Sequence, residues 1–380
     1  MSDATPSIGS FLCHYCEKQY ASEELTRTIG SAKVSLCQRC ATTFDYLSNQ
    51  EDYSTISVRG FPLERFQQES GRKLFHSLVT QKVLEEIQEV YLTNTGLENI
   101  PELVVAFPNL RLLVLKGNQL KRFPLQITHL SNLEVLNLSL NQVKFVPRAV
   151  KKLHNLVELD LSQNTLWCLP KEINHLTNLK RLFLDQNSFR AFPRYLTSLP
   201  NLESLSLSQS QIKSMPRTFD MPSLKSLSLA RNRIAVLPRC LSNCSTIEIL
   251  DLSNNQIGEL PKHFTELQNL TELHLSHNNL KYVQKELWLM PKLEHLDLSY
   301  NQVSSIPPDI IPQIRVKTID LSGNNIKELP SNLWQNPHIE ELNLENNPLS
   351  VGAKKLLNVP RRDMVKHSNE VRMYSRQDKR

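Results

Sequence analysis

Residues 159–170 read LDLSQNTLWCLP, and this short stretch contains every part of a pattern that repeats along the chain. Written as LxLxxNxLxxLP, the pattern has an asparagine slot that Asn164 fills here. The slot recurs in order at Thr95, Asn118, Asn141, Asn164, Asn187, Ser210, Asn232, Asn255, Asn278, Asn301, Asn324 and Asn347. The 380-residue chain thus contains twelve copies, spaced by 23 residues except for one step of 22 residues between Ser210 and Asn232.

The spacing of the leucines predicts how each copy folds. Two leucines two positions apart point to the same side of a short strand. The second leucine of successive copies forms one column: Leu138, Leu161, Leu184, Leu207, Leu229, Leu252, Leu275, Leu298, Leu321 and Leu344. Stacked strands form a parallel sheet, and burying each leucine is worth roughly 1.5–3 kcal/mol. The asparagine amide can pair with backbone groups that the turn leaves without partners, and the proline begins the return path over the convex side. We therefore expect an α/β solenoid of leucine-rich repeats over residues 90–358, in which neighbouring repeats stabilise one another.

The 23-residue unit LxxLxxLxLxxNxLxxLPxxI resembles the repeat of the intracellular Ras-signalling group of leucine-rich-repeat proteins, which includes the Ras-suppressor scaffolds. The resemblance covers residues 90–350. It implies a curved binding scaffold without catalytic machinery, often serving small-GTPase or phosphatase complexes. The repeat is specific for this architecture and says little about the partner.

Four cysteines near the N-terminus are spaced as a zinc site. Cys13 and Cys16 form one CxxC pair, and Cys37 and Cys40 form a second pair after a 20-residue gap. Four thiolates are the soft tetrahedral set that a structural Zn²⁺ prefers. The alternative is four unrelated reduced cysteines. We predict a zinc-finger module over residues 1–48 that contacts a protein or caps the fold, because its balanced charges lack what phosphate binding needs.

The segments on either side of the repeats differ from them in composition. Residues 61–88 place apolar side chains at mostly helical spacings, so we predict a helical cap at 49–89 that covers the open end of the sheet. Residues 359–380 are basic and lack apolar periodicity, which indicates a disordered tail. Cys168, Cys240 and Cys244 fall inside the repeats and are expected to be small buried residues.

Residues that alternate with the buried leucines should line the concave face. We predict a partner-binding face at Arg181, Phe183, Ser206, Ser228, Asp251, Glu272, His274, His295, Asp297, Tyr300, Asp320, Glu341 and Asn343. Carboxylates on neighbouring copies of a chain with net charge +6 favour a protein partner with a basic contact surface. Alternatively, aspartate is simply what the LDLS pattern carries. His274 and His295 lie on diagonal positions, which disfavours a shared metal ion.

Ser206 and Ser228 belong to the seam around the 22-residue step, where small side chains would let a partner approach closely.

A column of cations directly follows the proline slot. We call it the basic flank: Arg148, Lys171, Arg194, Arg217, Arg239, Lys262 and Lys285. With strands about 4.8 Å apart, the column would be roughly 30 Å long. It would meet an acidic partner or an anionic membrane surface, or it is a solvating cation copied with the repeat.

The composition disfavours several functional classes. The nine glycines are widely spaced, so no phosphate-cradling loop is present, and a net charge of +6 is too small to indicate specific nucleic-acid binding. No apolar run is long enough to span a bilayer, and the first residues do not resemble a signal peptide. We expect a non-enzymatic, monomeric scaffold or adaptor in the cytoplasm or the nucleus. The alternative is a substrate-recognition subunit of a ubiquitin ligase.

Overall fold

The computed structural model describes residues 11–12, 19–20, 25–29, 32–36, 55–57, 87–100, 104–105, 107–333 and 336–357. The four cysteines of the predicted zinc site, the tail and most of the predicted cap lie outside these residues. The chain divides into two compact units, residues 1–159 and 160–380, and each is described by itself.

The first unit contains two short antiparallel hairpins and the beginning of a parallel sheet. Its described elements are β1 (Phe11–Leu12), β2 (Gln19–Tyr20), β3 (Leu25–Ile29), β4 (Ala32–Leu36), β5 (Thr55–Ser57), β6 (Glu89–Tyr91), β7 (Leu112–Val114), η3 (Leu125–His129), β8 (Val135–Asn137), η4 (Arg148–Lys152) and β9 (Glu158–Asp160), where η denotes a 3₁₀ helix. Strand β1 pairs with β2 and β3 with β4, whereas β5, β6, β7 and β8 pair in parallel. Strand β5 precedes the first copy of the repeat, so the sheet begins earlier than the repeat count predicts.

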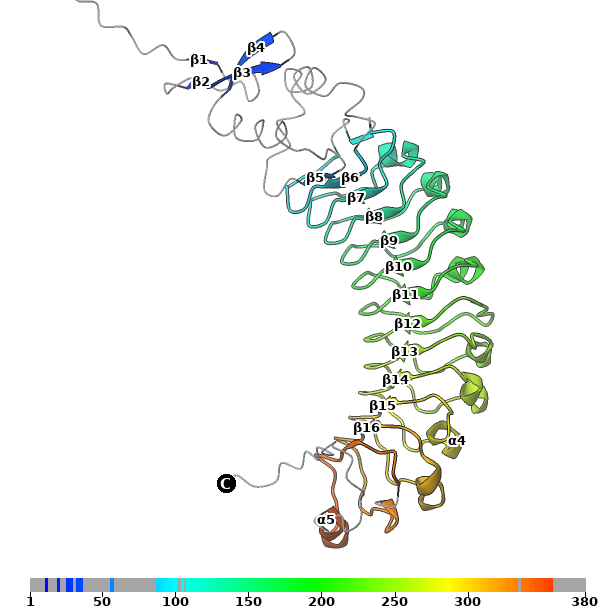
Figure 1. The fold of residues 1–380 in the computed structure, drawn as a ribbon. Helices are drawn as coiled ribbons and strands as arrows, with labels where there is room; N and C mark the ends of the chain where they lie inside the picture. The colour runs from blue at the N-terminus through cyan, green and yellow to red at the C-terminus, as the bar shows by residue number, and fades with distance from the viewer. Residues whose placement is uncertain are drawn as a thin grey trace, which may run out of the picture. The chain divides into compact units, whose positions relative to one another are not determined.

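The second unit is a stack of parallel strands joined by short helices. Its described elements are η5 (Lys171–His175), β10 (Arg181–Phe183), η6 (Arg194–Ser198), β11 (Ser204–Ser206), β12 (Ser226–Ser228), η7 (Arg239–Asn243), β13 (Ile249–Asp251), η8 (Lys262–Glu266), β14 (Glu272–His274), α4 (Lys285–Trp288), β15 (His295–Asp297), η9 (Pro308–Gln313), β16 (Thr318–Asp320), β17 (Glu341–Asn343) and α5 (Val351–Leu357). Each strand from β10 to β17 pairs with the next in parallel. Within this unit the strands lie along the inner, concave side and the helices along the outer side (Figure 1).

The predicted leucine column is confirmed. Every strand of the repeats has three residues, and the middle one is buried while its two neighbours face the concave side. In β14, for example, Leu273 is buried between Glu272 and His274. Leu275, which follows the strand and belongs to the predicted column, is also fully buried. The core therefore runs between the sheet and the outer helices as one continuous layer of leucines in each unit.

The asparagine slot also acts as predicted, and its hydrogen bonds link three repeats. Asn255 is buried, and its Nδ2 donates to the carbonyl oxygens of Leu252 at 3.0 Å and of Leu229 at 2.9 Å. Its Oδ1 accepts from the Ile234 amide at 3.0 Å. The amide of Asn278 donates to the same Leu252 carbonyl. The Leu229 and Leu252 carbonyls thus each accept from two successive asparagines, which satisfies backbone groups that would otherwise be orphaned in the core.

The prolines begin the convex path, as expected. Pro170, Pro193, Pro238 and Pro261 have φ between −64° and −72°, and each directly precedes a 3₁₀ helix. The shortened repeat is the exception, because no helix follows Pro216. One missing residue removes the turn that a helix would need, and the basic-flank residue of this repeat lies in irregular chain.

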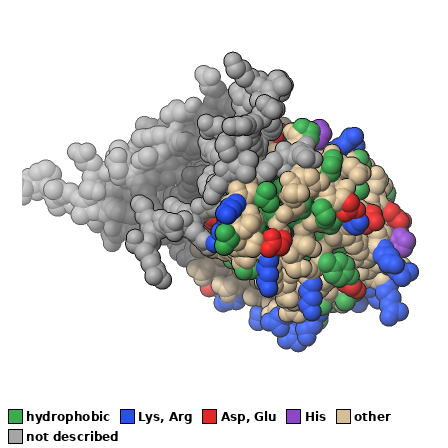
Figure 2. Space-filling view, turned by 90° about the horizontal axis from the view of Figure 1, so that it is seen from below, with side chains coloured by type: hydrophobic (Ala, Val, Ile, Leu, Met, Phe, Trp, Pro, Cys, Tyr) green, Lys and Arg blue, Asp and Glu red, His purple; other side chains and the backbone are tan. Residues whose placement is uncertain are grey.

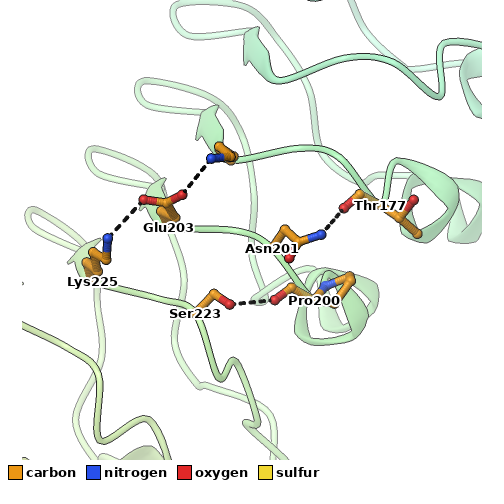
Figure 3. A network of polar contacts seen from close by, with 7 residues as sticks. Thr177, Pro200, Asn201, Glu203, Ser223 and Lys225 are labelled. Carbon is orange, nitrogen blue, oxygen red and sulfur yellow. Dashed lines mark hydrogen bonds and ion pairs between the residues drawn. The ribbon is translucent and has the colours of Figure 1, made fainter.

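A second ladder of polar contacts crosses the convex side and was not predicted. The Asn201 Nδ2 donates to the Thr177 carbonyl at 2.9 Å, and the Ser223 Oγ donates to the Pro200 carbonyl at 2.8 Å (Figure 3). The periodic NL dipeptides, such as those at Asn155 and Asn269, provide the sequence signal for this ladder. These residues hold neighbouring convex turns together at the surface.

Candidate partner-binding face

The predicted acidic residues come together on the concave side of β13–β17. Sheet register places Asp251 beside His274, His274 beside Asp297, and Asp297 beside Asp320. Adjacent parallel strands lie about 4.8 Å apart, so the two last carboxylates are direct neighbours. We call Asp251, Glu272, Asp297, Asp320, Glu341 and Glu345 the acidic face. All six are half-buried or exposed.

The aspartates have a local structural role that the sequence reasoning missed. In each DLS segment the carboxylate accepts a hydrogen bond from the serine amide two residues later. The distances are 3.0 Å for Asp251, 2.9 Å for Asp297 and 2.8 Å for Asp320. The preference for aspartate in LDLS is therefore explained by capping of the strand end. This role uses one carboxylate oxygen, Oδ1, and leaves the other for further contacts.

The Oδ2 atoms of these three aspartates differ in their hydrogen-bond partners. Oδ2 of Asp251 accepts from Ser228 Oγ at 3.3 Å, and Oδ2 of Asp320 accepts from Asn343 Nδ2 at 3.0 Å. Among the described residues, nothing bonds to Oδ2 of Asp297. The carboxylate in the middle of the acidic face can therefore accept a donor from outside the chain.

Tyr300 lies at the edge of this face in a fixed orientation. Its ring stacks on the His277 ring with centroids 4.4 Å apart and planes within 5°. On its other side is Gly323, where an added Cβ would lie 2.7 Å from Tyr300 Cδ1. The Tyr300 side chain is still 50% exposed. The absent side chain of Gly323 thus makes room for an aromatic ring that is stacked on one face and half open to solvent.

His277 and Tyr300 share an unusual backbone position. The residue before each asparagine slot has positive φ, for example 55° at His277, 53° at Tyr300 and 54° at Arg231. Left-handed backbone is rarely adopted by residues with side chains, yet the turn requires it in every repeat. The position was not predicted because its residue types vary from leucine to tyrosine.

The histidines do not form a metal site with their neighbours. His274 lies 3.6 Å from Glu272 as a loose ion pair, and the register sets Glu272 against His295. His274 and His295 are therefore diagonal, as predicted. Within the described part of the chain, no three His, Cys, Asp or Glu side chains are grouped so that they could share a metal ion.

The seam separates the acidic face from Arg181 and Phe183 on β10. Ser206 Oγ donates to the Asp185 carboxylate, and the Ser208 amide donates to the same group at 2.7 Å. Ser208 and Ser228 share a hydrogen bond of 2.7 Å between their hydroxyls. The small side chains are thus tied to one another across β10, β11 and β12.

The basic flank follows the helix starts of the second unit. Lys171, Arg194, Arg239, Lys262 and Lys285 are the first residues of η5, η6, η7, η8 and α4, and all are exposed. A cation at a helix N-terminus lies at the unfavourable end of the helix dipole, so these helices do not require it. Lys and Arg side chains gather mostly at one border of the described surface in Figure 2. Among the described residues, no helix has the length and apolar composition needed to cross a bilayer.

Of the three remaining cysteines, one is buried and two are half-buried. Cys244 is fully buried, and burial raises the pKa of its thiol to about 11. Cys168 and Cys240 are half-buried, which corrects the expectation that all three are buried.

Comparison with known proteins identifies the repeats. A leucine-rich repeat region model matches residues 87–220, a leucine rich repeat model matches 200–257 and 245–303, and a further one matches 315–336. Among curated proteins, none matches the sequence.

Solved structures share the fold. A leucine-rich-repeat protein of Leptospira interrogans is 27% identical, with TM-score 0.65, over 74% of this chain and 84% of that one. An internalin from Listeria monocytogenes is 20% identical, with TM-score 0.61, over 80% of this chain and 90% of that one. A chain of the LRIM1/APL1C complex is 22% identical, with TM-score 0.61, over 76% of this chain and 54% of that one.

Proposed function

Because the chain belongs to the leucine-rich-repeat proteins, whose repeats typically bind other proteins, we propose that it is a non-enzymatic scaffold and that the acidic face binds a protein partner. The observation that carries the proposal is the row of carboxylates on five consecutive strands, β13 to β17. The chain is positively charged overall, so this row is a local reversal of sign.

The chemistry of the face favours a basic contact surface on the partner. Strand capping accounts for one oxygen of each aspartate, but not for Glu272 and Glu341, which lie at the other end of their strands. Opposite charge on the partner would speed association and select it over acidic competitors. The stacked Tyr300 ring offers a rigid, partly polar anchor beside the carboxylates, of the kind enriched in binding hot spots.

The test reverses charge in the middle of the face. The double variant Asp297→Lys with Asp320→Lys keeps the leucine core but replaces two neighbouring carboxylates. Both full-length proteins are used for proximity labelling in cells, and each protein recovered only with the wild type is then purified for direct binding measurements at several salt concentrations. We expect affinity to fall at least about tenfold in the variant and the salt dependence to become weaker.

A matched control separates this site from net charge. Glu259→Lys with Glu328→Lys makes the same change in total charge at two exposed positions outside the strands. It should retain binding within about twofold. Equal partner sets and equal affinities for wild type and the Asp297/Asp320 variant would eliminate the acidic face as the binding site.

The resemblance of the repeat to Ras-group proteins supports a small-GTPase or phosphatase complex, and the alternative is substrate recognition for a ubiquitin ligase. The proteins recovered by proximity labelling distinguish them: cullin-type ligase components would favour the alternative. The LRIM1/APL1C complex is an assembly built with a similar fold, and it supports protein binding without indicating the partner.

We also propose that Cys13, Cys16, Cys37 and Cys40 hold one structural Zn²⁺. The described strands support this, since β1 ends directly before Cys13 and β4 ends directly before Cys37, and β1 contacts β4. Elemental analysis should find about one zinc per chain. Cys37→Ser with Cys40→Ser should lose it, and Cys240→Ser should keep it. Absence of zinc from freshly purified wild-type protein would exclude the site.

A further inference from the structure

A surface hollow of about 580 Å³ lies on the flank of the second unit, away from the concave face. It is lined by the chain that follows the asparagine slots of two consecutive repeats and by the start of η6. The residues that give it its chemistry are Trp167, Phe189, Arg190, Phe192, Arg194 and Tyr195. Aromatic rings and guanidinium groups thus meet in one concavity, which neither the repeat pattern nor the acidic face explains.

The floor of the hollow is apolar and rigid. Phe189 is fully buried and Phe192 is almost so. The Phe192 ring packs edge-on against Phe219, with centroids 5.3 Å apart. Phe219 comes from the irregular segment of the shortened repeat, where the two neighbouring repeats have η6 and η7. The shortened repeat thus supplies one of the rings packed beneath the hollow.

The rim combines an exposed aromatic ring with an arginine side chain that contacts a neighbouring tyrosine. The Trp167 side chain is 65% exposed. The Arg194 guanidinium lies over the Tyr195 ring at 5.1 Å from its centroid, and it donates to the Tyr195 hydroxyl at 3.2 Å. Exposed tryptophan and stacked arginine are the residue types enriched where proteins bind one another.

The charge on the rim is not neutralised by the chain itself. Among the described residues, no carboxylate forms an ion pair with Arg190 or Arg194. The exposed residues Lys171 and Arg217 extend the same sign of charge along the basic flank. Guanidinium groups bind carboxylates through two parallel hydrogen bonds, so the rim is complementary to an acidic ligand.

We propose that this hollow binds an acidic peptide segment of a protein partner, with one apolar side chain against the exposed Trp167 ring and carboxylates on Arg190 and Arg194. A peptide fits better than a membrane or a nucleic acid, because carboxylates accompany the cations and aromatic rings at the far end of the basic flank. Four repeats further on, the exposed Tyr282 donates to Glu259, and Lys285 is paired with Asp309. An extended polyanion would meet these carboxylates, whereas a short peptide would not.

The experiment measures binding of a fluorescein-labelled synthetic peptide to the full-length chain by anisotropy. The probe has eight residues, with a central leucine flanked by glutamate and aspartate. One companion peptide replaces the leucine by serine, and another replaces the acidic residues by serine. We expect the parent peptide to bind at least about tenfold more tightly than either companion. Arg190→Glu with Arg194→Glu should remove this preference, and so should Trp167→Ser.

The matched control is Lys262→Glu with Lys281→Glu, which reverses two exposed charges on the same flank away from the hollow. It should keep the peptide affinity within about twofold, and circular dichroism should show all variants folded. If the control variant loses as much peptide affinity as the Arg190/Arg194 variant, or if the serine-centred peptide binds as tightly as the parent peptide, binding depends only on overall charge. Either result would overturn the proposal. Tighter binding of oligouridine or phosphatidylserine vesicles, lost in the Arg190/Arg194 variant, would replace the peptide by a polyanion and overturn it as well.

Discussion

Replacing Asn255 by alanine tests the physical basis of the repeat. The change orphans the Ile234 amide, which has Asn255 Oδ1 as its acceptor at 3.0 Å. The carbonyls of Leu229 and Leu252 lose one donor each but keep a second one, from Asn232 and Asn278 respectively. An unsatisfied buried amide costs about 1–3 kcal/mol and each lost additional bond about 0.5–1 kcal/mol. We therefore expect the variant to be less stable by about 2–5 kcal/mol.

Two measurements check this estimate. Urea unfolding followed by circular dichroism gives the change in the free energy of unfolding, with Asn279→Ala, at a solvent-exposed position, as the control; the control should change stability by less than about 0.5 kcal/mol. Hydrogen–deuterium exchange should show faster exchange of the Ile234 amide, while the Ile212 amide, bonded to Asn232, stays protected. If Asn255→Ala and Asn279→Ala have equal stability and Ile234 stays protected, the asparagine ladder does not stabilise the fold in the way described.

Three further perturbations follow from single contacts. Gly323→Ala places a Cβ 2.7 Å from Tyr300 Cδ1 at a φ of +65° and should lower stability by about 1–2 kcal/mol in thermal melts. Burial raises the pKa of Cys244 from 9.0 to about 11. Because the unfolded thiol ionises first, stability should fall as pH rises through this range, and in alkylation followed by mass spectrometry Cys244 should react more slowly than Cys168. Lys225 and then Lys180 lower the pKa of the exposed Glu203 carboxyl (Figure 3). The contribution of these two ion pairs is present above the unfolded pKa of the carboxyl and is lost as pH falls. Because the groups are exposed and screened by 0.15 M salt, the contribution is small, and Glu203→Gln should leave the free energy of unfolding at neutral pH nearly unchanged.

The strands and the asparagine ladder could be predicted because their interactions repeat at a fixed sequence separation. Leu273 and Asn255 each do what the same slot does in the neighbouring repeats, so one copy of the pattern describes the others. The positive-φ position escaped prediction because the turn imposes the conformation on unlike side chains, such as Arg231 and Tyr300. At this position the geometry of the turn sets the backbone conformation, so the residue type does not predict it.

The hollow on the flank could not be predicted for a different reason. Trp167 and Arg190 lie in corresponding slots of consecutive repeats, and their periodic position alone indicates only exposure. The floor includes the edge-on contact of Phe192 with Phe219, which pairs a ring of a regular repeat with a ring of the shortened one. Side-chain packing between two repeats, one of them irregular, is not encoded in the pattern of either.

The shortened repeat therefore links two departures from the pattern. Ser210 bonds only weakly to the Asn187 carbonyl, at 3.4 Å, and among the described residues nothing takes the role of Oδ1 for the Phe189 amide, which lines the hollow. Ser210→Asn restores both the Nδ2 donor and the Oδ1 acceptor of the asparagine slot, and it should raise the free energy of unfolding by about 1 kcal/mol. If the looser turn helps the hollow accept a side chain, the same variant should bind the acidic peptide more weakly although it is more stable. A gain in stability with unchanged peptide affinity would show that the serine is a tolerated irregularity with no part in peptide binding.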